Sequence, residues 1–104
     1  MHFVVLGVHS AEVCPTSNAK SKALLLEVGP QIPTIAEKVG VKILAGPYVN
    51  REHMTVTIVE TDRAEALDDF LVESRLSHWN TVHVIPSHPM DVGMKEIAEG
   101  KTLF

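Results

Sequence analysis

Three histidines and one cysteine are the side chains of this sequence best suited to chemistry. His9 and Cys14 lie five residues apart, just after an apolar run, and Cys14 is the chain's only cysteine. His53 and His83 each lie at or near the start of a later β-like segment. Imidazole and thiolate groups bind zinc, copper, nickel and iron. No HExxH or CxxC motif is present, so the fold must assemble any site from distant residues.

Strands and helices must position these side chains. The hydrophobic periodicity predicts one domain, residues 1–104, with the element order β-α-β-β-α-β. Strands are expected at 2–9, 41–49, 53–60 and 81–86, and helices at 19–40 and about 62–75. Gly29, Pro30 and Pro33 interrupt the first helix, so it should kink or split. From about residue 88 we expect a C-terminal extension with a short helix and an apolar tail at 101–104.

Capping residues predict where the helices begin and end. Ser17 or Asn18 can accept hydrogen bonds from the first helical N–H groups, and Gly40 suits the left-handed position that ends the first helix. Asp62 with Glu65 resembles a capping box that would begin the second helix. In the second strand, Gly46-Pro47 predicts a bulge or a sheet edge, because proline cannot donate to a central ladder.

This element order is that of the ferredoxin-like α+β fold. Right-handed crossovers then give a four-stranded antiparallel sheet of order 4-1-3-2, with both helices on one face. Alternation along the strands predicts that the helices are faced by Val4, Leu6, Val8, Met54, Val56, Ile58, Val82 and Val84. The open face would carry Phe3, Val5, Gly7, His9, Leu44, Gly46, Tyr48, His53, Thr55, Thr57, Val59, Thr81, His83 and Ile85. Because a large apolar patch seldom stays in water, a second copy is expected to cover this face.

Together with this order, the segments "GVKILAGPYVN" and "WNTVHVIP" resemble the dimeric α/β-barrel superfamily over most of residues 1–90. The superfamily includes cofactor-independent monooxygenases, muconolactone-isomerase-like enzymes, haem-dependent chlorite dismutases and small nickel-binding ferredoxin-like proteins. The resemblance implies a homodimer with a cavity on the open face. It implies no single chemistry, because this fold hosts many.

The predicted topology brings the three histidines together. The first strand is antiparallel to its two neighbours, so His9 at its end should lie beside the beginnings of the strands that carry His53 and His83. With Cys14 in the adjacent loop, these residues form a candidate site for nickel, copper, zinc or iron. Two histidines and a cysteine with a nearby methionine would favour copper, and Met90 is a candidate for that methionine.

Three functions are compatible with this site. The first is a small homodimeric protein that binds a transition metal. The second is a metal-free monooxygenase- or isomerase-like enzyme that binds a small apolar substrate, with His53 or His9 as general base and Tyr48 or Thr55 orienting the substrate. The third is a ligand-binding or interaction module without catalysis.

Composition narrows the classes of partner and the compartment. The formal net charge is −4 and no Lys/Arg cluster is present, so a nucleic-acid partner is not expected. The apolar run at the N-terminus is too short for a membrane span and lacks a basic flank, so no membrane anchor or signal peptide is expected. A single cysteine cannot form an intrachain disulfide, which is compatible with the reducing cytoplasm.

Overall fold

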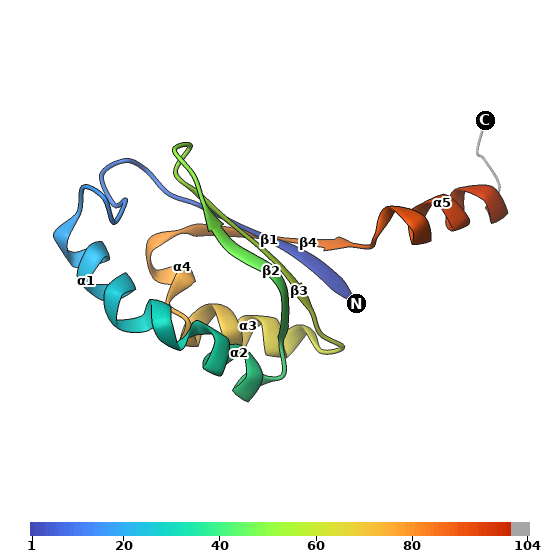
Figure 1. Ribbon diagram of the computed structural model, residues 1–104, viewed down its shortest axis with the longest axis horizontal. Coiled ribbons are helices and arrows are strands. Elements are labelled where there is room, and N and C mark those ends of the chain that lie inside the picture. Colours follow the sequence, from blue (N-terminus) through green and yellow to red (C-terminus); the bar gives the residue numbers. More distant parts are fainter. Residues whose placement is uncertain (101–104) are drawn as a thin grey trace.

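The computed structural model describes residues 1–100 as an α+β arrangement in which helices cover one face of an antiparallel sheet (Figure 1). The tail expected at 101–104 lies outside the described residues. The strands are β1 (His2–Val8), β2 (Lys42–Val49), β3 (Met54–Glu60) and β4 (Thr81–Ser87). The helices are α1 (Ala19–Val28), α2 (Ile32–Val39), α3 (Ala64–Glu73), α4 (Leu76–Trp79) and α5 (Met90–Glu99), with a 3₁₀ turn, η1 (Gly29–Gln31), between α1 and α2.

The sheet has the strand order β2-β3-β1-β4, which reads 4-1-3-2 from the β4 edge. All neighbouring strands are antiparallel. β1 is central, and Val8 at its end is paired with Met54 on one side and Thr81 on the other. The arrangement is compatible with a ferredoxin-like fold. It brings the end of β1 beside the beginnings of β3 and β4, where the histidines were expected to meet.

The expected break in the first helix is confirmed. α1 ends at Val28, η1 contains Gly29 and Pro30, and α2 begins at Ile32. Asn18 is the N-cap of α1, and its side chain accepts a hydrogen bond from the Ser21 N–H at 3.0 Å. Gly40 ends α2 with φ of 87°, in the left-handed region that glycine adopts without a steric penalty.

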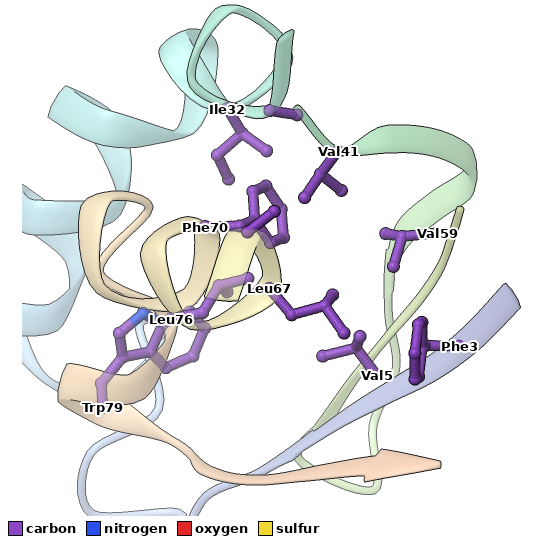
Figure 2. Packing of buried hydrophobic residues seen from close by; sticks show 11 residues of the cluster. Phe3, Val5, Ile32, Val41, Val59, Leu67, Phe70, Leu76 and Trp79 are labelled. Atoms are coloured by element: carbon purple, nitrogen blue, oxygen red, sulfur yellow. The ribbon is translucent and has the colours of Figure 1, made fainter. Parts of the chain in front are cut away.

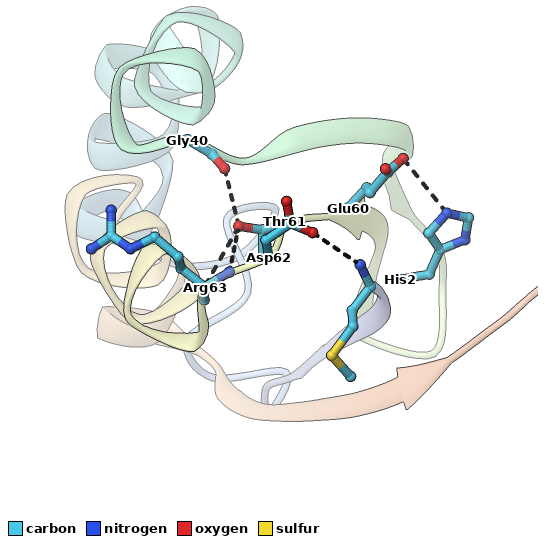
Figure 3. Close-up of polar contacts among 7 residues, drawn as sticks. His2, Gly40, Glu60, Thr61, Asp62 and Arg63 are labelled. Atoms are coloured by element: carbon cyan, nitrogen blue, oxygen red, sulfur yellow. Dashed lines mark hydrogen bonds and ion pairs between the residues drawn. The ribbon is translucent and has the colours of Figure 1, made fainter.

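The second helix begins differently from the prediction. α3 starts at Ala64, and its N-cap residue is Arg63. Among residues 1–100 no side chain caps this helix, so the capping box expected at Asp62 is wrong. Thr61 organises this corner, as Figure 3 shows: its hydroxyl donates to the Gly40 carbonyl at 3.1 Å and accepts from the Arg63 N–H at 3.3 Å. Thr61 therefore links the end of α2 to the approach to α3.

The buried core lies between the sheet and the helices and includes Phe3, Val5, Val59, Leu67 and Phe70 (Figure 2). Side chains buried on β1 and β3 are thus the ones that the sequence assigned to the open face. That assignment is wrong for both strands. The residues expected to face the helices instead share the open face, where they are half-buried or exposed: Val4, Leu6, Val8, Met54, Val56 and Ile58.

The assignment is correct for β4, whose Val82 and Val84 are paired with Gly7 and Val5 and so share the helix-covered face. The error has a physical cause. On β1 both alternating sets are apolar, so alternation does not distinguish the two faces. On β3 the buried set contains Thr55 and Thr57, which makes it less hydrophobic than the set on the open face.

Two further features were predicted from the sequence. β2 is an edge strand whose pairing register shifts between Ala45 and Tyr48, around Gly46-Pro47, so the expected bulge is confirmed. The C-terminal helix is also present as α5. Figure 1 shows that α5 extends away from the sheet, and its Met90, Met94 and Ile97 are exposed.

Candidate metal centre

His9, Cys14 and His53 meet at the end of β1, and each offers a ligand atom that lies within 4.8 Å of the others. They come from three segments: the residue after β1, the loop before α1, and the turn before β3. The backbone N–H of His9 donates to the His53 carbonyl at 3.0 Å, which joins two of these segments. The two imidazole rings lie edge to face with their centroids 5.6 Å apart.

A hydrogen-bonded loop holds Cys14 in place. Its N–H donates to the Ser10 carbonyl at 3.1 Å, and its carbonyl accepts from the N–H groups of Ser17 and Asn18 at 2.9 and 2.8 Å. Because Asn18 is the N-cap of α1, the start of that helix fixes the position of the cysteine. The side chain is buried, with 8% of its surface exposed.

The surroundings of Cys14 favour its thiolate form. Hydrogen bonds from the Thr16 hydroxyl and then the Thr16 backbone make the largest contributions to lowering the pKa of Cys14 from 9.0 to about 6. The neighbouring His9 and His53 add smaller lowerings, and burial opposes the shift. The sulfur lies 3.1 Å from the Thr16 Oγ1 atom. Thiolate is the form of cysteine that binds metals and attacks electrophiles.

One nitrogen of the His53 ring has no hydrogen-bond partner among the described residues. His53 adopts a left-handed backbone conformation with φ of 56° as it leads into β3. Its Nδ1 atom is buried and has no hydrogen bond within residues 1–100. Since a buried polar atom without a partner is unfavourable, this nitrogen can be stabilised by a bound ion or ligand.

A cavity of about 140 Å³ adjoins the group. His9, Cys14 and Thr16 contribute to its lining, and the remaining wall is largely apolar: Pro15, Leu25, Val49, Asn50, Met54 and Trp79. A liquid water molecule occupies about 30 Å³, so the cavity suits an ion with a small exogenous ligand better than a large substrate. Trp79 also packs against His9, with the ring centroids 4.9 Å apart.

His83 does not join this group. It is paired with Leu6, whose side chain lies on the open face, whereas His9 contacts Trp79 on the helix-covered face. Residues paired directly across two strands share a face, so the sheet separates His83 from His9. The expected convergence of three strand histidines is therefore wrong for His83, because β1 and β3 present the opposite faces from those predicted.

The expected pocket residues are also separated. Tyr48 is paired with Val56 and is exposed on the open face, as predicted. Thr55 is buried on the other face. Met90 is on α5 and is 78% exposed, and it does not line the cavity within the described residues. The methionine that lines the cavity is Met54.

Two neighbours of the site were not predicted from the sequence. Thr16, two residues after Cys14, could have been recognised as a local hydroxyl donor to the sulfur. Asn80, whose Oδ1 atom lies 2.9 Å from His9 Nδ1, is 71 residues away from it, and no local pattern indicates the pairing.

Comparisons of the chain with protein-family models, curated proteins and solved structures find no match. Within residues 1–100, no helix has both the length and the apolar character needed to cross a membrane.

Proposed function

We propose that this protein binds a transition-metal ion through His9, Cys14 and His53. The observation that carries the proposal is the convergence of two imidazoles and one thiol, from three segments, within 4.8 Å. The lowered pKa of Cys14 supports it, because a thiol must lose its proton to bind a metal. The buried Nδ1 of His53, which has no partner among the described residues, supports it as well.

The donor set narrows the choice among nickel, copper, zinc and iron. Thiolate favours Cu(I) and zinc, and imidazole suits all four metals. Met54 is among the residues that line the cavity. Two histidines, a cysteine and a distant methionine are a ligand set used by copper proteins. Three protein ligands leave a coordination position for a small exogenous ligand, and the adjoining cavity could accommodate one.

We further propose that the protein is a homodimer paired through its open face, as its resemblance to the dimeric α/β barrels suggests. The apolar side chains of that face support this: Val4, Leu6, Val56, Ile58 and Ile85. A second exposed apolar surface supports it too, because Met90, Met94 and Ile97 are spaced to lie on one side of α5. Metal binding by Cys14 requires a reduced thiol, so we propose a cytoplasmic location.

Titration of metal-free protein with Co²⁺ tests the metal site directly. We expect one ion per chain and a thiolate-to-cobalt charge-transfer band that disappears in Cys14→Ser. His53→Gln should weaken binding, whereas His83→Gln, the same change on the other face of the sheet, should not. Binding that persists unchanged in Cys14→Ser, or an absence of stoichiometric binding, would overturn the proposal. Competition among Ni²⁺, Zn²⁺ and Cu⁺ would then identify the preferred metal.

A second function, a metal-free enzyme with a histidine general base, is favoured by one observation. Asn80 lies within hydrogen-bonding distance of His9 Nδ1, so the other ring nitrogen is free to take a proton. The small apolar cavity beside it would bind the substrate. This function predicts that chelator-treated protein binds a small phenol, with a change in Trp79 fluorescence that is lost in His9→Gln. If chelation abolishes all ligand binding, the metal function is favoured instead.

A further inference from the structure

The orientation of the Asn80 carboxamide is determined by two hydrogen-bonding groups of different kinds. Its Nδ2 atom lies 3.0 Å from the carbonyl oxygen of Leu76, which can only accept a hydrogen bond. The amide nitrogen must therefore point to Leu76, and the amide oxygen must point to His9. Asn80 is 8% exposed, so water competes little for either contact.

This orientation assigns the proton on His9. Asn80 Oδ1 and His9 Nδ1 are 2.9 Å apart, and an amide oxygen cannot donate. The ring nitrogen must donate, so Nδ1 carries the hydrogen. In a neutral imidazole the other nitrogen, Nε2, then has the free lone pair that a metal or a proton requires.

Gly7 provides the space for this contact. A Cβ atom at Gly7 would lie 2.9 Å from both the Cγ and Oδ1 atoms of Asn80, and closer still to the Thr55 Oγ1 atom. Real Cβ atoms essentially never make such close contacts. The Asn80 carboxamide can therefore lie this close to β1 only because residue 7 has no side chain. Gly7 lies two residues before His9, which follows the end of β1, so both residues face the same side of the sheet. This places the glycine beside the ring that Asn80 contacts.

We propose that Asn80 is a positioning residue that holds His9 in its Nδ1–H tautomer and presents Nε2 as the metal ligand; this inference rests on the proposed metal function. Metal-bound histidines commonly donate their second nitrogen to such an acceptor, and loss of that acceptor typically weakens metal binding about 10- to 100-fold. Gly7 contributes indirectly, because the absence of a side chain there leaves space for the Asn80 oxygen to reach the His9 ring.

The tautomer can be measured without any metal, by ¹⁵N NMR of the histidine rings in metal-free protein at alkaline pH. The His9 signals are assigned by their loss in His9→Gln. We expect a protonated Nδ1 and an unprotonated Nε2 in the wild type and in Asn80→Asp, which keeps an acceptor oxygen. Asn80→Leu and Gly7→Ala should give a mixture of tautomers, whereas Ser77→Ala, a change in α4 just before Asn80, should not.

Metal affinity supplies the second measurement. We expect Asn80→Leu to lose about 10- to 100-fold in Co²⁺ affinity and Asn80→Asp to restore most of it. A wild-type His9 with its proton on Nε2, or an Asn80→Leu protein with unchanged tautomer and affinity, would overturn the inference. The two proposals fail separately: absence of metal binding with an Nδ1–H ring contradicts the metal function, whereas metal binding with an Nε2–H ring contradicts the role of Asn80.

Discussion

The pKa of Cys14 is the property of the site most open to direct test, and Thr16 is the residue to change. The Thr16 hydroxyl makes the largest contribution to the lowering of that pKa, followed by the Thr16 backbone. Thr16→Ala removes the hydroxyl and leaves the backbone contact and both histidines. We therefore expect the pKa of Cys14 to rise in Thr16→Ala. Thr16→Ser keeps a hydroxyl and should leave the pKa near the wild-type value.

The lowered pKa of Cys14 changes the midpoint of its titration much more than it changes its reaction rate at pH 7. With a pKa of about 6 instead of 9.0, the thiolate fraction at pH 7 is roughly 90% instead of roughly 1%. A less basic thiolate is also a weaker nucleophile, by about 20-fold for this difference when the Brønsted coefficient is about 0.45. The net gain in the rate of thiol–disulfide exchange at pH 7 is therefore only about four-fold. The midpoint, rather than the rate, is the decisive quantity.

The assay is the rate of exchange with a small dipyridyl disulfide, measured as a function of pH on metal-free protein. The wild type should show a midpoint at about 6 and a plateau rate about 20-fold below that of the unfolded chain. The midpoint should move to higher pH in Thr16→Ala and stay in place in Thr34→Ala, a change at an exposed threonine of α2. A wild-type midpoint at the ordinary thiol value would refute the reasoning.

The same pKa sets a pH dependence of stability. In the folded protein Cys14 has a lower pKa than in the unfolded chain, so between about pH 6 and 9 the unfolded state binds more protons. The free energy of unfolding should therefore rise with pH across this window, and the contribution is lost as the pH falls through about 6. Cys14→Ser should remove this part of the slope in urea denaturation, and an unchanged slope would contradict the assignment.

Three further predictions concern the fold and the assembly. Phe70→Ala should lower the free energy of unfolding by about 3–5 kcal/mol in urea titrations, because Phe70 is fully buried; a loss below about 1 kcal/mol would contradict its central place in the core. Gly40→Ala should cost about 1 kcal/mol through its positive φ alone, since no atom of the described residues lies within 4 Å of the added Cβ atom; a neutral result would contradict this. Ile85→Glu on the open face should convert dimer to monomer in light scattering while Leu26→Glu on α1 does not; equal behaviour of the two variants would refute pairing through that face.

Much of the local structure was predictable because its causes lie close together in the sequence. The split between α1 and α2 follows from the flexible backbone of Gly29 and the ring constraints of Pro30 and Pro33, which act within one turn. The cap at Asn18 and the left-handed Gly40 are likewise decided by their own side chains. The start of α3 was mispredicted because Thr61, outside the expected capping box, makes the contacts that organise that corner.

The candidate site was predicted in part. Topology alone indicated that His9 and His53 would be neighbours, since antiparallel pairing places the end of β1 beside the start of β3. Both faces of β1 are apolar, however, so the sequence could not indicate which face the helices cover, and His83 was assigned to a group that it does not join. Asn80 was missed because its contact with His9 depends on how α4 packs against the sheet.

The sequence by itself determined the strands, the helix breaks, the order of the sheet and the caps at Asn18 and Gly40, because each depends on periodicity or on conformational preferences within a few residues. Only the tertiary structure decided which face of the sheet is buried. Which face is buried depends on how all the elements pack together. The two faces are similarly apolar, so the local sequence pattern does not distinguish them. This packing places Cys14, His9, His53 and Asn80 on one side of the sheet and His83 on the other.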